Sequence, residues 1–355
     1  MNLKLNFIFL LLPIIAFPQS YSVKGQLWTN ALTGDDVPTG QSAFESTIGY
    51  IPNFSISKEL NQLSLLDLEF AYRFDKSYSG DSLTQKHENP HRAWIRYSSE
   101  KIEARLGLQK IVFGPSQVLR SLSWFDTFNL ADPTGQTDGV NAFRLRWFPN
   151  NNLSLWSWAI REKEELSFGG RTELSNAFGE WGFTFHDDSE VHDRMVGQTP
   201  IMISEPNKRI GLDYRYDGFI GFWNESAIVY LDDRELGFMT VGADYTLPIA
   251  SGILVMTETL YMSNSYTKKD QILSAFMSSI PIGMINQLMF ITQVDWEEEH
   301  AYHYIRWSAT YDRFSLNFIL SRSPNRSGYS VPSEYLPQTV TGFGTNFQIM
   351  FIYNH

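Results

Sequence analysis

The chain has 355 residues, no cysteine, and 39 acidic against 28 basic residues, which gives a formal net charge of −11. The missing cysteines exclude disulfides, thiolate zinc sites, cysteine nucleophiles and a lipid anchor on an N-terminal cysteine. The negative charge, without any Lys/Arg-rich run, argues against nucleic-acid binding. An ordinary apolar content argues against a helical membrane protein, which needs repeated apolar runs of about 20 residues.

Met1–Ser20 predicts a secretory signal peptide. A lysine precedes an apolar run of about ten residues, and a polar break follows. The run is too short to span a bilayer comfortably, and Pro13 and Pro18 would interrupt a buried helix. We expect cleavage after Gln19 or Ser20. This leaves residues 21–355 as one exported domain, and the loss of Lys4 makes its net charge −12.

Past Tyr21 the sequence has the period of β-strands. In Leu66–Phe74 every second side chain is apolar, and Asp67, Glu69 and Arg73 lie on the opposite face. A period of two predicts strands with one apolar and one polar face, and no convincing amphipathic helix interrupts it. The same alternation recurs, with Trp94 as an exception on a polar face, in Ala93–Tyr97, Ile102–Leu108, Phe143–Trp147, Leu212–Tyr216, Ile305–Tyr311 and Phe347–Tyr353.

Two all-β architectures would produce this alternation. A soluble β-sandwich packs its apolar faces together, whereas a transmembrane barrel turns them to lipid and its polar faces to the interior. Segments of nine or more residues, and tight turns that alternate with long polar loops, favour a single antiparallel transmembrane β-barrel. Aromatic residues near segment ends are typical of its interfacial girdles, at Phe74, Tyr97, Trp147, Tyr216, Tyr311 and Tyr353.

We expect 16–18 strands. The uncertain stretch is 163–207, where Phe178–Asp187 predicts one further strand. An even number of strands is required if both ends of the chain lie in the periplasm. Either a second strand near Met195–Ile203 therefore joins Phe178–Asp187 in the barrel, or both segments belong to a loop. Gly169–Arg171 is expected to be a turn. Such a wide barrel holds an aqueous lumen or a plug. The sixteen clear strands are expected to begin near residues 21, 43, 62, 91, 102, 140, 153, 208, 219, 237, 252, 272, 284, 301, 313 and 344.

One stretch carries a family resemblance. Arg105–Gly139 reads RLGLQKIVFGPSQVLRSLSWFDTFNLADPTGQTDG. An R-x-G-x-Q strand, followed by aromatics, D-x-F-N and D-P, resembles a part of porin-type outer-membrane barrels. Among these are porin-like, polysaccharide-export and capsule-assembly barrels of Bacteroidota. The resemblance covers about a tenth of the chain and does not indicate a substrate. It implies that Phe113–Thr137 folds inward and narrows the pore, with Phe113, Trp124, Asp126 and Asp132 in the constriction.

Arginines recur on the polar faces of neighbouring strands. We call Arg92, Arg96, Arg105, Arg144 and Arg146 the arginine row; only Glu103 interrupts it. In a narrow passage such a row would line the pore, concentrate anions and bind carboxylate or phosphate groups through its guanidinium forks. The alternative is that the row braces the wall by pairing with acids, for which Asp67, Glu69, Asp126 and Asp132 are the candidates.

Signals of enzymatic chemistry are weak. His300 and His303 would lie on opposite faces of a strand, which does not suit a zinc pair. The cluster His186–Asp193 offers oxygen ligands but no regular metal-binding loop. No Ser-His-acid spacing and no phosphate-binding glycine loop is evident. We therefore expect no enzyme activity, no cofactor and no metal.

Two functional classes remain. One is an outer-membrane channel for passive diffusion, with a possible preference for anions or polysaccharide. The other is a non-enzymatic accessory, gate or plug subunit of a larger outer-membrane translocon or export complex. The expected partners are outer-membrane lipid, small solutes or polysaccharide in the lumen and, for the second class, other proteins of the complex.

Overall fold

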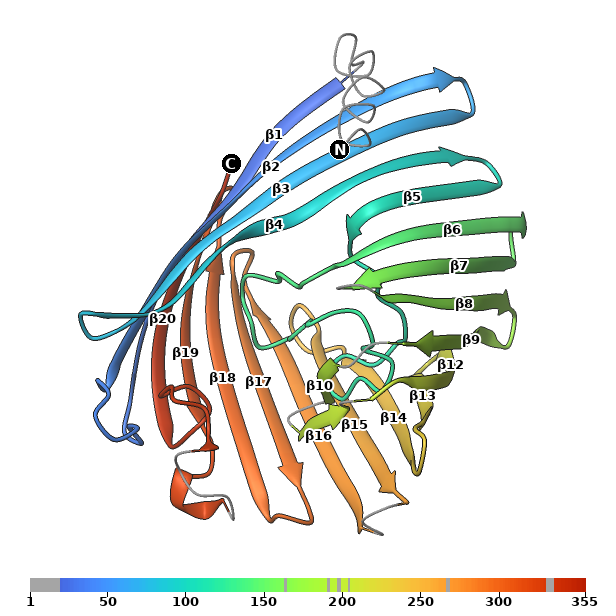
Figure 1. Ribbon diagram of the computed structural model, residues 1–355. Helices are drawn as coiled ribbons and strands as arrows, with labels where there is room; N and C mark the ends of the chain where they lie inside the picture. Colours follow the sequence, from blue (N-terminus) through green and yellow to red (C-terminus); the bar gives the residue numbers. More distant parts are fainter. Residues whose placement is uncertain are drawn as a thin grey trace.

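A computed structural model describes residues 20–162, 165–189, 192–196, 199–203, 205–265, 269–329 and 335–355. In this part of the chain eighteen antiparallel strands form one closed barrel (Figure 1), because each strand pairs with the next and β20 pairs with β1. This confirms the predicted all-β barrel. The first nine strands are β1 (Ser20–Gly34), β2 (Phe44–Asn61), β3 (Ser64–Ser79), β4 (Ser82–Ser99), β5 (Ile102–Gln109), β6 (Val140–Asn150), β7 (Leu153–Glu162), β8 (Glu165–Asn176) and β9 (Gly179–Asp188).

The second half of the barrel follows a small separate hairpin, and a short 3₁₀ turn, Arg326–Gly328, precedes the last strand. No helix in the described ranges has the length and apolarity needed to cross a membrane. The hairpin is β10 (His192–Val196) and β11 (Thr199–Ile203), and the remaining barrel strands are β12 (Asn207–Asp217), β13 (Gly221–Tyr230), β14 (Glu235–Leu247), β15 (Ile253–Asn264), β16 (Lys269–Ile282), β17 (Asn286–Asp295), β18 (His300–Thr310), β19 (Phe314–Arg322) and β20 (Thr345–Asn354).

Over β3–β6 the two faces of the wall have the predicted characters, whereas the interior face of β13–β17, predicted to be polar, is largely apolar. The outward-facing aromatic side chains are 44–47% exposed: Phe70, Phe74, Phe143 and Trp147. Arg144, which follows Phe143 in the chain and points inward, is 6% exposed. An apolar outer surface around a closed barrel is the pattern expected of a barrel in lipid. Most of the predicted girdle aromatics are exposed on this outer face: Phe74, Tyr97, Trp147, Tyr216 and Tyr311.

The stretch 163–207 differs from the expectation in one respect. The eighteenth strand is β8, not Met195–Ile203, which falls partly in the separate hairpin. Gly169–Arg171, expected to be a turn, lies within β8. Glycine in a strand often marks the close approach of a neighbouring group. Here a Cβ on Gly169 would lie 2.6 Å from the indole of Trp158, its partner on β7. The glycine therefore makes room for an aromatic ring.

β4 also begins earlier than expected, at Ser82 rather than near residue 91. Residues 82–90 pair with β3 but are exposed, and most of them are polar. Without an apolar face they lack the alternation that identifies a strand in sequence. Two of the predicted tight turns are confirmed. Two residues lie between β4 and β5, and two between β6 and β7.

Residues 110–139, which connect β5 to β6, fold into the barrel; we call them the inward segment. In Figure 1 the teal trace of this segment runs across the interior between the walls. Its polar atoms contact side chains of β1, β4, β13, β14, β15 and β18. The predicted inward-folded segment is therefore present, and it reaches most of the way around the barrel.

Candidate functional site: the lumen of the barrel

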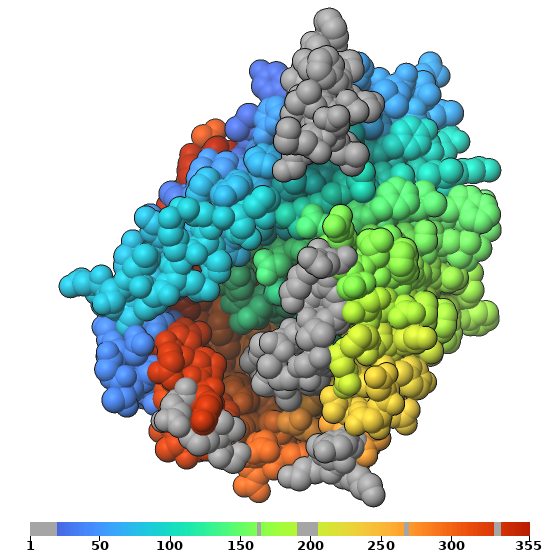
Figure 2. All heavy atoms as spheres, in the orientation of Figure 1, coloured from blue at the N-terminus to red at the C-terminus, as the bar shows by residue number. Residues whose placement is uncertain are grey.

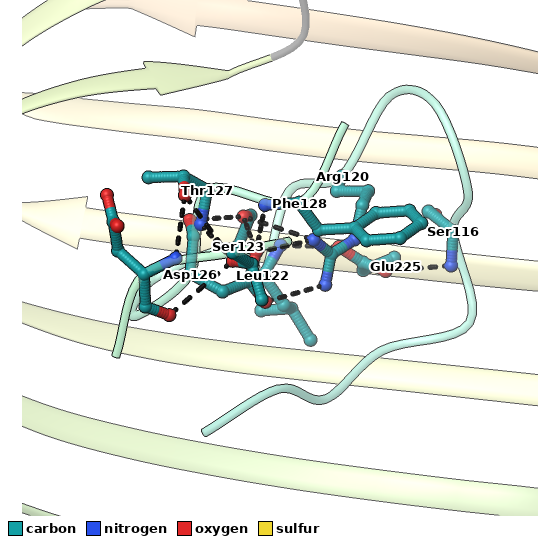
Figure 3. Close-up of polar contacts among 10 residues, drawn as sticks. Ser116, Arg120, Leu122, Ser123, Asp126, Thr127, Phe128 and Glu225 are labelled. Carbon is teal, nitrogen blue, oxygen red and sulfur yellow. Dashed lines mark hydrogen bonds and ion pairs between the residues drawn. The ribbon is translucent and has the colours of Figure 1, made fainter. Parts of the chain in front are cut away.

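Two buried wall carboxylates hold one end of the inward segment. Glu258 on β15 accepts hydrogen bonds from the backbone N–H groups of residues 117, 118 and 119, with N···O distances of 2.7, 3.0 and 2.7 Å. Glu225 on β13 accepts from the N–H groups of Ser116, at 3.0 Å, and Leu122 (Figure 3). Five orphan donors of an irregular segment are thus satisfied by two acids, which a buried backbone requires.

The contact with Glu225 leaves no room for a side chain at Gly114. This glycine has a φ of +89°, and a Cβ there would lie 2.4 Å from a carboxylate oxygen of Glu225. Only glycine combines such a left-handed φ with so close an approach at little cost. On β14 the Thr240 hydroxyl donates to the carbonyl of Leu119 at 2.8 Å. The segment is therefore seated closely against β13–β15.

An apolar cluster fills the space between this part of the segment and the wall. Phe113 and Trp124, predicted for the constriction, are 5% and 4% exposed and pack against each other and Phe125 at ring-centroid distances of 5.6–6.4 Å. Burying such a side chain contributes about 1.5–3 kcal/mol, so these two residues anchor the segment. From the wall, the cluster takes in Val140, Ala142, Trp158, Ile160, Ala227, Val229, Leu236, Phe238, Leu260, Met262, Leu273 and Ala275.

Asp126 and Asp132, the acidic residues predicted for the constriction, organise the segment itself. Asp126 pairs with Arg120 through N···O distances of 2.6 and 3.1 Å and accepts from Ser123 (Figure 3). Burial alone raises the pKa of the Asp126 carboxyl, but the hydrogen bonds and charge of Arg120 outweigh it and hold this pKa below the usual value. Asp132 accepts hydrogen bonds from the N–H and hydroxyl of Thr134.

Single hydrogen bonds hold the other end of the segment to the opposite wall. Tyr304 on β18 donates to the carbonyl of Ala131 at 2.7 Å, and Arg92 on β4 donates to that of Thr137 at 2.6 Å. Gln136 donates to Gln26 on β1 at 2.9 Å. The segment thus crosses the lumen and is attached on both sides. The space-filling view in Figure 2 shows this face of the molecule hollowed, with teal residues recessed in the hollow.

The structure aligns three members of the arginine row. Arg96, Arg105 and Arg144 are direct partners on β4, β5 and β6. They alternate with outward-facing apolar residues and so face the interior. Directly opposite side chains have Cβ atoms about 5 Å apart, where like charges repel. Arg146 is opposite Glu103, nearer the tight turns, and Arg92 lies beside the inward segment.

Acids on neighbouring strands partly neutralise the row. Arg96 donates to Asp67 at 2.6 and 2.9 Å, a pairing that the bracing alternative anticipated. Arg144 donates to Glu103 at 2.7 Å. Arg146 lies 3.9 Å from Glu173 and Arg105 lies 3.6 Å from Glu103, beyond ordinary hydrogen-bond length. Arg105 and Arg146 therefore hold the looser ion pairs.

Two tryptophans lie among the arginines. Trp94, the exception in the alternation of β4, has the guanidinium carbons of Arg105 and Arg96 at 4.4 and 5.6 Å from its ring centroid. Arg146 lies 4.0 Å from the ring of Trp156. Such cation–π contacts fix the guanidinium planes. In the described part of the chain, the Nε atoms of Arg105, Arg144 and Arg146 have no hydrogen-bond acceptor.

The sequence analysis missed the residues that seat the inward segment. Glu225 and Glu258 are single acids on strand faces that are otherwise mostly apolar, and the serine and threonine side chains of β13 and β15 lie on the opposite faces. Nothing in a period-two pattern tells a buried carboxylate from one that faces water. The one available signal was that Glu258 is bracketed by Met256 and Leu260, and a lone acid on an otherwise apolar face needs a partner.

The histidines do not converge. His300 lies 3.2 Å from the carbonyl of Gly328, and His303 lies 3.2 Å from Thr292. His186 is buried beside Trp158, while residues 190–191 of its acidic cluster lie outside the described residues. Within the described ranges no group of three or more His, Asp or Glu side chains is arranged to hold a metal ion.

Comparisons with known proteins identify the fold. No family model and no curated protein matches the sequence. Among solved structures, OccK5 (OpdH) of Pseudomonas aeruginosa is similar with a TM-score of 0.61 at 6% identity, over 95% of this chain and 98% of its own. OccAB1 of Acinetobacter baumannii gives 0.61 at 8%, over 96% and 97%. A mutant porin of Rh. blastica gives 0.51 at 11%, over 95% and 100%. The chain therefore has a porin-type fold.

Proposed function

We propose that the chain is a porin-like channel of the outer membrane that passes small solutes by passive diffusion. The support is a closed barrel with an apolar outer face, a charged inner face and a fold shared with a porin. The signal peptide at Met1–Ser20 and the Bacteroidota type belong to this proposal. The first rests on sequence of which the structure describes only Ser20, and the second on the resemblance of Arg105–Gly139.

We further propose that the channel prefers anions. The single observation that carries this is the direct alignment of Arg96, Arg105 and Arg144 on the interior face. Arginine retains its charge and binds oxyanions bidentately, and a row of one sign in a confined passage raises the local concentration of the opposite sign. The row would thus set a positive potential locally, although the whole chain is acidic.

The alternative is an accessory or plug subunit of a larger outer-membrane complex. Its support is the inward segment, which crosses the lumen and is attached to both walls. A planar-bilayer recording of the purified protein separates the two functions. Steady ohmic conductance supports the channel, whereas a closed barrel that co-purifies with a larger partner supports the subunit.

Charge reversal tests the anion preference. Arg105→Glu combined with Arg146→Glu should move the reversal potential in a KCl gradient toward cations. The shift should weaken with salt, because the Debye length falls from about 10 Å at 0.1 M to about 3 Å at 1 M. Arg313→Glu, a single reversal in the exposed turn between β18 and β19, is the control. A loss of thermal stability without any shift in selectivity would leave the row a brace and refute the anion channel.

A further inference from the structure

One carboxylate, Glu103, lies within the arginine row and is shared by three guanidinium groups. Its Oε1 accepts from Arg144 at 2.7 Å and lies 3.6 Å from Arg105, while its Oε2 lies 3.7 Å from Arg96. Only the first contact has the length of a hydrogen bond. Glu103 thus holds one arginine firmly and two loosely.

Two other interior arginines each have an acid of their own. Arg171 donates to both oxygens of Asp213, at 2.6 and 2.9 Å, and Arg120 has the same arrangement with Asp126. At Glu103, by contrast, Arg96, Arg105 and Arg144 have two carboxylates within 4 Å, those of Glu103 and Asp67. Glu69 acts on Arg105 only from farther away, so within 4 Å the arginines outnumber the acids by one.

The cluster is also partly accessible. The side chains of Glu103 and Arg105 are each 15% exposed, whereas the Nε atoms of Arg105 and Arg144 are buried and lack acceptors. A guanidinium fork matches two oxygens of an oxyanion. Such an anion would contact the same groups that Glu103 now occupies.

We propose that Glu103 is a tethered counter-ion, which a small oxyanion displaces on its way through and which then returns to expel that anion. This inference rests on the proposed anion channel and names what sets the dwell time of its solute. Conduction requires sites that bind well enough for entry and weakly enough for exit. The Glu103 carboxylate has the same charge and chemistry as the anion and competes with it for the same arginines. It therefore weakens anion binding while the arginines stay in place.

Glu103→Gln tests the proposal with sulfate as the probe. The variant removes the competing charge, so sulfate added to a KCl recording should reduce the chloride current at a lower concentration. Because the competing charge-assisted hydrogen bond is lost, the half-blocking concentration should fall roughly tenfold or more. Glu69→Gln is the matched control, because Glu69 is an interior acid that accepts from Asn53 at 2.8 Å.

The outcomes separate this inference from the proposed function. If the wild-type protein carries no anion-selective current, both the proposed anion channel and the tethered counter-ion are refuted. An anion-selective wild type whose sulfate block is unchanged by Glu103→Gln, or changes equally with Glu69→Gln, refutes the tethered counter-ion alone. Should Glu103→Gln fail to assemble, Glu103→Asp keeps the charge but shortens its reach. The proposal then requires that sulfate block the chloride current of Glu103→Asp at a lower concentration than that of the wild type. Block at an equal concentration overturns the proposal.

Discussion

Glu258→Gln should detach the inward segment while leaving the barrel intact. Glu258 is fully buried and accepts three backbone hydrogen bonds from residues 117–119. Glutamine keeps the shape but replaces one oxygen with an NH₂ group. At least one of the three N–H groups then faces a donor, and the others lose a charged acceptor.

The expected cost follows from these contacts. A hydrogen bond to a charged group contributes about 1.5–3 kcal/mol, and a buried donor without an acceptor costs about 1–3 kcal/mol. We expect the local attachment to weaken by about 3 kcal/mol, which raises the detached population by roughly a hundredfold. Strand pairing of β15 with β14 and β16 is unaffected, because it uses backbone groups.

Labelling of a single cysteine measures the detachment. The chain has no native cysteine, and Ser116 is 3% exposed with a hydroxyl that has no hydrogen-bond partner in the described structure. Ser116→Cys should therefore be tolerated and react slowly with a maleimide in the otherwise native protein. Adding Glu258→Gln should accelerate the reaction, and single-channel conductance should rise as the segment leaves the wall.

Thr257→Val is the matched control, since Thr257 is the next residue on β15 and is exposed, on the opposite face from Glu258. The decisive comparison is made between folded barrels, identified by heat-modifiable gel mobility. If Glu258→Gln labels no faster than Thr257→Val, the apolar cluster around Phe113 and Trp124 holds the segment without the carboxylate, and the reasoning fails.

Three further predictions concern the lipid face, acid sensitivity and export. Phe70→Arg should lower the folding yield, because a charge on the lipid face near the bilayer midplane costs about 2–4 kcal/mol. Glu69→Gln on the interior face should fold normally. The reverse order of folding yields would make the face assignment wrong. The lowered pKa of Asp126 means that its pairing with Arg120 is fully present above about pH 4 and is lost as pH falls through that lowered pKa. The labelling rate of Ser116→Cys, divided by that of an exposed cysteine at the same pH because only the thiolate reacts, should thus rise in acid, and Asp126→Asn should reduce that pH dependence. Finally, the mature protein should begin near residue 20 and fractionate with the outer membrane; recovery in the soluble periplasm without detergent would contradict this.

The strand pattern was readable because the two faces of the wall meet different surroundings. Segments with one lipid-facing and one interior face, such as Leu66–Phe74, alternate clearly and were placed close to their observed bounds. The failures occur where that contrast is absent. Residues 82–90 of β4 are exposed, and β8 has glycines at 169 and 170 where side chains would show the period.

The arginine row was likewise visible in sequence as a set of interior-face residues, but its geometry was not. That Arg96, Arg105 and Arg144 are direct cross-strand partners depends on the register of β4, β5 and β6. A shift of one strand by two residues keeps every side chain on its face and changes every partner. The sharing of Glu103 among three arginines could therefore not be predicted.

The sequence by itself determined the all-β class and placed the arginines on the polar faces of the strands, because these follow from a period of two repeated along the chain. Segment length and the alternation of turns and loops favoured a barrel over a sandwich. Only the tertiary structure decided how the lumen is filled. The inward segment has no periodicity, and its position depends on Glu225 and Glu258, which lie more than 100 residues away in the chain. Local pattern specifies which way a side chain points, whereas closure of the barrel specifies what it meets across the interior.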